Sequence, residues 1–146
     1  MAKRLAAAAL LVIAAQAASF AQASPTLDGT WLTADGSAKI RFEPCAAALC
    51  GRLVWLREPN DPETGQPILD KNNPNPAQRG RPLLGIPVIT DIKAIERGEW
   101  RANAYNAEDS ETYEVTLKLT SPNQLALRGC GLFGLICKRE LWSRSQ

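Results

Sequence analysis

The chain has 146 residues, of which 17 are Lys or Arg, 15 are Asp or Glu and none is His, and its hydrophobic fraction is 45%. This length predicts one domain, with or without a processed segment. The absence of histidine excludes the commonest general base at neutral pH, the usual zinc and copper ligand, and the Ser–His and Cys–His catalytic pairs. The nearly neutral charge argues against a nucleic-acid partner, because such proteins present a basic face.

The first 23 residues have the pattern of a secretory signal peptide. Lys3 and Arg4 precede an alanine-rich apolar run, which ends in small residues at the spacing that a signal peptidase recognises. The run is too short to cross a bilayer, so we expect no membrane span. Cleavage near Ala23-Ser24 would give a periplasmic or secreted protein. The remaining residues 24–146 have 15 basic and 15 acidic side chains and are predicted to form a single domain.

Apolar and polar residues alternate in several segments of the mature chain, as expected for strands with one buried face. The alternation is strict in three segments, 38–43, 113–119 and 125–127, and weaker in six others, 30–33, 49–56, 86–89, 92–95, 100–106 and 138–143. About nine short strands separated by turns predict an all-β fold, a small antiparallel up-and-down β-barrel. Closure would remove the exposed edges of such a sheet.

A long Pro/Asn-rich loop is predicted over residues 57–87, which contain seven of the ten prolines. Proline donates no ladder hydrogen bond, so this segment is not a central strand. Loops of this length within a compact domain are generally functional or disordered. Because prolines lower the entropy cost of ordering, we expect this loop to be ordered.

The four cysteines, Cys45, Cys50, Cys130 and Cys137, all lie in the predicted exported part of the chain. An even number of cysteines in an oxidising compartment predicts disulfides, and four cysteines allow three connectivities. We favour Cys45–Cys50 and Cys130–Cys137, because each pair flanks a short turn-like segment. A zinc site is the alternative, although both spacings are wide for zinc.

A structural signature is formed by Gly29 and Trp31 in the first strand with Trp142 and Arg144 in the last. This arrangement resembles that of lipocalins and related calycin barrels, in which the first-strand Trp packs at the closed end and an Arg lies across it. A guanidinium stacks favourably on an indole ring, and its donors can bond nearby carbonyls. The signature implies a structural role for these four residues.

A second resemblance covers nearly the whole mature chain and concerns a bacterial exported family, domain of unknown function 2147. The matching blocks are Gly29-Thr30-Trp31, Pro44-Cys45, Leu49 through Leu56, Asp70-x-x-Asn73-Pro74, Arg81-Pro82-Leu83-x-Gly85, Trp100, Tyr105 through Tyr113, Leu127-Arg128-Gly129-Cys130 and Trp142-x-Arg144. The resemblance implies a small exported lipocalin-like barrel with no established activity. The chain departs from the family at 106–110, where Asn-Ala-Glu-Asp-Ser replaces the usual Asp, Pro and Gly.

Three aromatic residues, Trp55, Trp100 and Tyr105, are candidates for lining a ligand site, although aromatic residues at strand spacing more often fill a core. The segment 100–106 alternates small and large side chains. If its alanines point inward, the barrel has spare volume, as ligand-binding barrels do. If they point outward, Tyr105 fills the interior and the barrel is solid.

Two arginines of the long loop, Arg79 and Arg81, are candidate anchors for a ligand carboxylate or phosphate at the barrel mouth. In the alternative interpretation they pair with Asp61, Glu63 or Asp70 and hold the loop in place. The sequence favours this second interpretation, because neutral chains usually use their arginines in structural pairs.

The polar side chains of the loop, Asp70 and Asn73 among them, are also ligand-binding candidates. Asp61, Glu63 and Asp70 could suggest a calcium site, but Gly65 and Pro67 interrupt the alternate spacing that a calcium loop requires. Asx turns, in which the side chain bonds the backbone two residues on, explain these residues better. Paired carboxylates could also serve glycoside hydrolysis.

The sequence therefore favours a lipocalin-like protein that binds a small apolar or amphipathic molecule. The first alternative is an envelope protein-interaction or inhibitor module that uses loop 57–87. The second is a carboxylate-based hydrolase, which the absence of histidine and of a free cysteine disfavours. We predict no catalytic residue, cofactor or metal.

Overall fold

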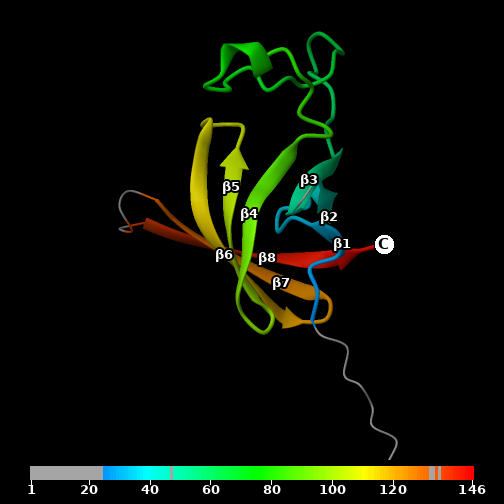
Figure 1. The fold of residues 1–146 in the computed structure, drawn as a ribbon. Helices are drawn as coiled ribbons and strands as arrows, with labels where there is room; N and C mark the ends of the chain where they lie inside the picture. The colour runs from blue at the N-terminus through cyan, green and yellow to red at the C-terminus, as the bar shows by residue number, and fades with distance from the viewer. Residues whose placement is uncertain (1–24, 47, 132–133, 135) are drawn as a thin grey trace, which may run out of the picture.

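The computed structural model describes residues 25–46, 48–131, 134 and 136–146. The predicted signal peptide lies outside the described residues. Eight strands and one short 3-10 helix follow one another along the described chain (Figure 1). They are β1 (Gly29–Leu32), β2 (Ala38–Cys45), β3 (Ala48–Leu56), η1 (Pro76–Gln78), β4 (Pro87–Glu96), β5 (Glu99–Asn106), β6 (Glu111–Ser121), β7 (Gln124–Gly131) and β8 (Ile136–Ser145).

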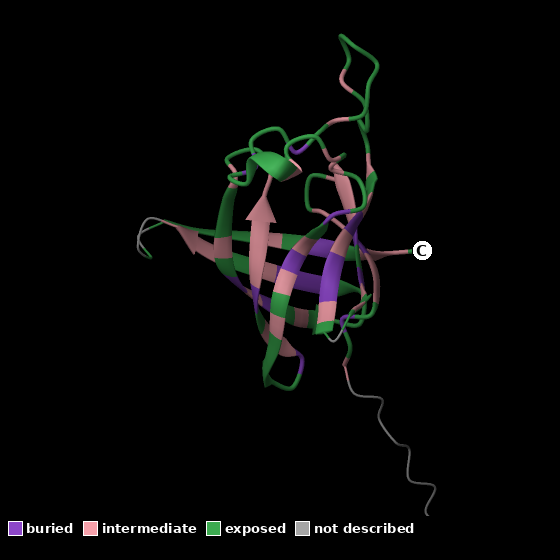
Figure 2. Cartoon of the chain, turned by 45° about the horizontal axis from the view of Figure 1, so that its top comes forward, coloured by how far each residue is buried: buried purple, intermediate pink, exposed green. Residues whose placement is uncertain are grey.

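The strands form a closed antiparallel barrel in which each strand pairs with its neighbours in sequence and β8 pairs with β1. This confirms the predicted all-β, up-and-down architecture. Buried and exposed positions alternate along the strands, so that one face of the sheet forms the core (Figure 2). The buried core consists of Leu27, Trp31, Ile40, Phe42, Leu53, Ile89, Ala102, Val115, Leu117, Leu125 and Trp142.

The two predicted strands 86–89 and 92–95 are a single strand, so the prediction of a break between them was wrong. The register between β4 and β5 shifts between Thr90 and Lys93. Asp91, within this shift, has a φ of 51°. A bulge inserts an extra residue and bends a strand without ending it, and this irregularity interrupts the alternation of apolar and polar residues along β4.

Both predicted disulfides are present, Cys45–Cys50 between β2 and β3 and Cys130–Cys137 between β7 and β8. Cys130 and Cys137 lie directly opposite each other in the β7–β8 ladder. Each bridge therefore joins neighbouring strands of one hairpin. Such bridges are typical of proteins in oxidising compartments outside the cytoplasm.

One end of the barrel is closed around Trp31, whose side chain is fully buried and whose indole Nε1–H donates to the Leu27 carbonyl at 2.9 Å. The Arg144 guanidinium lies over the Trp31 ring, 4.2 Å from its centroid, and donates to the Asp28 carbonyl. Gly29 has a φ of 106°, and a Cβ there would lie 2.9 Å from Arg144 Nη1. The glycine thus leaves room for the stacked arginine.

Gly51 shows how tightly the middle of the barrel is packed. A Cβ at this position would lie 2.9 Å from both Ile40 Cγ2 and Ile89 Cβ. We expect Gly51→Ala to lower the free energy of unfolding by about 2 kcal/mol, because an overpacked core must distort. Chemical denaturation would measure this. Gly80→Ala is the control, since a Cβ there meets nothing within 4 Å; equal losses in the two variants would contradict the prediction.

Candidate ligand site

We call the end of the barrel at which β3 ends and β4 begins the open end. The inward-facing side chains differ in size and burial between the closed end and the open end. At the closed end the inward-facing residues include Trp31, Leu125 and Trp142, at most 5% exposed. At the open end, inward-facing Ala38, Ala104 and Gly131 are small and half-buried. The interior is therefore filled by large, buried side chains at the closed end, whereas at the open end its lining includes small, half-buried residues.

The alanines of β5 face the interior. Ala102 is 2% exposed within the core, and Ala104 packs against the same cluster opposite Ile89 and Tyr113. The side chain of Arg101, on the opposite face of the strand, is 61% exposed. Of the two orientations that the sequence allowed, the structure has the one that leaves small side chains inside.

Residues 57–86, which we call the strap, lie over the open end (Figure 1). Two of their segments run antiparallel: the Leu83 amide donates to the Ile68 carbonyl, and the Asp70 amide donates to the Arg81 carbonyl, each at 2.9 Å. Leu83 also packs against the barrel core. The long loop is thus ordered by its own hydrogen bonds and by an apolar contact with the barrel.

The strap is tied at both sides to turns of the barrel. Near its start, the Arg57 guanidinium donates to the Asp35 carbonyl in the β1–β2 turn at 2.7 Å. Further along, the Asn72 side-chain amide donates to the Glu108 carbonyl in the β5–β6 turn at 3.2 Å. The strap therefore connects two turns that lie at the open end.

The strongest attachment is a hydrogen-bond network around Asp70, which is 1% exposed. Its Oδ1 accepts from the Tyr105 hydroxyl at 2.7 Å. Its Oδ2 accepts from Asn73 Nδ2 at 2.7 Å and from Arg81 Nε and Nη2 at 3.0 and 2.8 Å. Because Tyr105 lies on β5, this network holds the strap on the barrel wall.

Burial alone would raise the pKa of Asp70, but hydrogen bonds from Tyr105, Asn73 and Arg81 outweigh it and bring the pKa below its usual range. Burial and the bond to the Asp70 carboxylate raise the pKa of the Tyr105 phenol. Asp70 is therefore an anion and Tyr105 a neutral donor at neutral pH. A buried carboxylate with this set of donors stabilises a fixed conformation.

The structure brings four of the predicted ligand-binding residues, Asp70, Asn73, Arg81 and Tyr105, into this one network. Arg79 lies beside it and donates from Nε to the Asn73 carbonyl at 2.8 Å. Arg81 thus forms an ion pair with Asp70, whereas Arg79 forms a hydrogen bond with a backbone carbonyl. Both arginines are engaged in holding the strap.

The two candidate tryptophans are separated. Trp100 packs against the core opposite Leu117. Trp55 lies opposite Lys39, whose ammonium is 5.5 Å from the indole centroid, and the Trp55 residue is 40% exposed on the outer wall. Trp55 therefore does not line the interior. The sequence left this open because both faces of its strand are apolar.

Two half-buried residues on the core-facing side of their strands are absent from the predicted set, Tyr113 and Glu140. Tyr113 lies across from Ala104. Glu140 accepts from the buried Trp142 indole at 3.1 Å and from Lys138 Nζ at 2.8 Å. The alternation of β6 already placed Tyr113 on the face of its buried neighbours, whereas charged residues on β8 gave no sign of an inward position.

The acidic residues of the strap form turns. The Asp61 carboxylate accepts from the Glu63 and Thr64 amides at 2.9 and 3.0 Å, which is the Asx-turn arrangement.

Within the described residues, no group of three or more His, Cys, Asp or Glu side chains is arranged to hold a metal. Carboxyl pKa values that shift clearly, such as those of Asp35 and Asp109, shift downward, whereas a general acid requires a raised value.

None of the helices in the described residues has the length and apolar character needed to cross a membrane.

No curated protein matches the sequence. A solved structure that is similar to this chain is that of a protein from the human pathogen Helicobacter pylori, described as belonging to the lipocalin family. The two share 22% sequence identity with a TM-score of 0.67, over 83% of this chain and 84% of that one, which supports a common fold.

The family model described as "Uncharacterized protein conserved in bacteria (DUF2147)" matches residues 29–144. This range begins in β1 and ends in β8, so it spans the whole barrel and the strap. It includes both the stacked Trp31–Arg144 pair and the Asp70 network. The chain therefore belongs to the DUF2147 family and has a lipocalin-like barrel fold.

Proposed function

We propose that the protein binds a small apolar or amphipathic molecule in the open half of the barrel, beneath the strap. The observation that carries this proposal is the change from large, fully buried side chains at the closed end to a half-buried lining that includes small residues at the open end. Ligand-binding barrels combine a packed closed end with space near the mouth. The lipocalin-like fold supports the same interpretation.

The apolar part of the ligand would lie against Ala104, Leu127 and Leu83, which line the open half and pack on the core. Its polar end would lie near the Tyr113 hydroxyl and the Glu140 carboxylate. The Asp70 network would position the strap over the ligand without contacting it. The two disulfides suit a periplasmic or secreted protein, where we place this one.

Ala104→Phe tests the proposal by filling the proposed site. We expect the variant to fold but to lose binding of an apolar reporter dye such as ANS by at least about tenfold, since a ring occupies volume that the dye needs. A fluorescence titration of folded protein measures this, with circular dichroism as the check on folding.

The matched control is Thr116→Phe, which places the same ring on the outward face of β6. It should leave dye binding unchanged. Equal binding by the wild type and both variants would contradict a site in the open half. Native mass spectrometry of protein purified from its own envelope provides an independent test, because a natural ligand would appear as added mass that Ala104→Phe removes.

A further inference from the structure

A row of cationic side chains crosses five strands on the outer wall of the barrel. Lys93 on β4 lies directly opposite Arg101 on β5, and Arg101 lies opposite Thr116 on β6. Thr116 in turn pairs with Arg128 on β7, and Arg128 pairs with Arg139 on β8. The ladder thus places four cations and one threonine in a single line across the wall, which we call the basic row.

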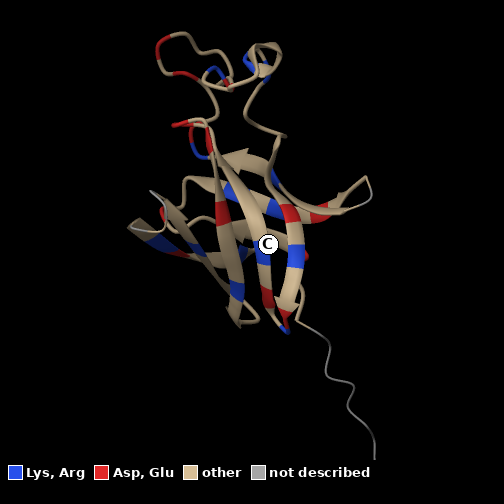
Figure 3. Ribbon diagram, turned by 60° about the vertical axis from the view of Figure 1, so that its left-hand side comes forward, with Lys and Arg blue, Asp and Glu red and all other residues tan. Residues whose placement is uncertain are grey.

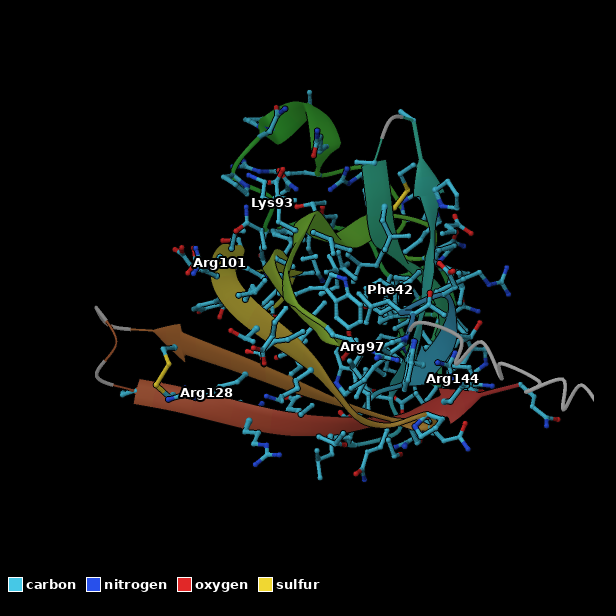
Figure 4. The ribbon with its side chains drawn as sticks, turned by 60° about the horizontal axis from the view of Figure 1, so that its bottom comes forward. Phe42, Lys93, Arg97, Arg101, Arg128 and Arg144 are labelled. Atoms are coloured by element: carbon cyan, nitrogen blue, oxygen red, sulfur yellow. A yellow bond between two sulfur atoms is a disulfide. The ribbon has the colours of Figure 1, made fainter. Side chains whose placement is uncertain are left out.

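The cations of the basic row are exposed and almost free of acidic partners. All four are exposed, whereas Thr116 is half-buried. Within the described residues, Arg101 has one ion pair, at 3.6 Å to Glu114, and Lys93, Arg128 and Arg139 have none. In Figure 4 the labelled Lys93, Arg101 and Arg128 lie along one side of the barrel, while Phe42 points into it.

The arrangement is unfavourable for the isolated barrel. Like charges directly opposite each other destabilise an antiparallel pair, and the row contains two such pairs, Lys93–Arg101 and Arg128–Arg139. Elsewhere on this wall Lys118 bonds Glu99 at 2.7 Å. Basic and acidic residues therefore mix over the wall (Figure 3), but the row itself contains no acid.

We infer that the basic row binds a linear polyanion, a flexible polymer with an anionic group on each repeat. Neighbouring strands lie about 4.8 Å apart, so the row is about 19 Å long, and an extended polymer can bridge successive cations. A flat anionic membrane would touch only part of the row, because the wall of a closed barrel is convex. This surface is separate from the barrel interior, so the inference does not depend on the proposed ligand site.

Binding of inorganic polyphosphate, measured by isothermal titration calorimetry, tests the inference. Each phosphate contact on a flexible strand makes affinity fall with salt, so four contacts predict a loss of roughly 50-fold between about 50 and about 200 mM salt. The Arg128→Gln/Arg139→Gln variant keeps two contacts, so its affinity should fall only roughly sevenfold over the same range of salt. The variant should also bind at least about tenfold more weakly at low salt.

The control variant, Arg41→Gln/Lys71→Gln, removes the same charge from positions outside the row and should bind polyphosphate almost as well as the wild type. The melting temperature of the Arg128→Gln/Arg139→Gln variant should be no lower than that of the wild type, because the substitutions remove an opposed pair of like charges. Equal weakening in both double variants would overturn the inference. So would equal binding of orthophosphate, or binding of phosphatidylglycerol vesicles without binding of polyphosphate.

Discussion

Trp31→Ala is expected to lower the free energy of unfolding by about 4 kcal/mol, which is a large part of the stability of a small domain. The indole is fully buried at the closed end, where it carries the Arg144 guanidinium and donates to the Leu27 carbonyl. Its removal leaves a cavity and takes away the surface on which Arg144 stacks. Urea denaturation followed by far-ultraviolet circular dichroism measures the change.

Trp55→Ala provides the matched control, because it removes the same side chain from the outer wall. Trp55 is 40% exposed, and the Lys39 ammonium lies over its ring. We expect a loss below about 1 kcal/mol, the scale of an exposed cation–π contact. Similar losses for the two variants would contradict the assignment of Trp31 as the residue that closes the barrel.

Arg81→Ala is expected to cost about 3 kcal/mol, because it leaves a buried carboxylate without its cation. The Asp70 side chain is fully buried, whereas that of Arg81 is 33% exposed, which places the loss at the lower end for such pairs. Arg79→Ala, which removes one bond to a backbone carbonyl, should cost about 1 kcal/mol. The double variant Asp70→Ala/Arg81→Ala should lose less than the sum of its two single changes, and full additivity would contradict the network.

The same network predicts how stability depends on pH. The pKa of Asp70 is lower in the folded protein than its ordinary value of 3.8. The network therefore contributes fully above that value, and its contribution is lost as the pH falls through the folded pKa. In Arg81→Ala the pKa of Asp70 rises toward its unfolded value, so the loss of stability on acidification should be smaller and should end at higher pH. Unfolding midpoints measured from pH 7 down to pH 2 would show this shallower profile, and identical profiles would contradict it.

Much of the barrel could be predicted because its strands follow the elementary period of two. Alternation around Ile40 and Phe42, and again from Tyr113 to Leu119, identified β2 and β6, and the exported context predicted the disulfide pairs. The break predicted within β4 was wrong because Asp91 adopts a positive φ and shifts the register. A bulge changes the face that each later residue occupies, and alternation alone does not reveal it.

The candidate site was only partly accessible to sequence reasoning. The sequence identifies the loop arginines and Asp70 as candidates and allows Arg81 to pair with Asp70. The bond between Asp70 and Tyr105 joins residues 35 apart, across a loop without regular periodicity. Such a contact depends on the path of the strap, which its hydrogen bonds set. The half-buried position of Glu140 likewise could not be predicted, because charged residues ordinarily indicate a solvent-facing strand position.

The pairing of β1 with β8 has a consequence for how the molecule forms. It joins the first strand to the last, and the Arg144 side chain donates to the Asp28 carbonyl across 116 residues of sequence. Contacts of such high separation carry a large loop-closure entropy and slow the folding of β-proteins. The hairpins can form locally, but the closed end is completed only after nearly the whole chain is available. Ring closure should therefore be a late event in folding.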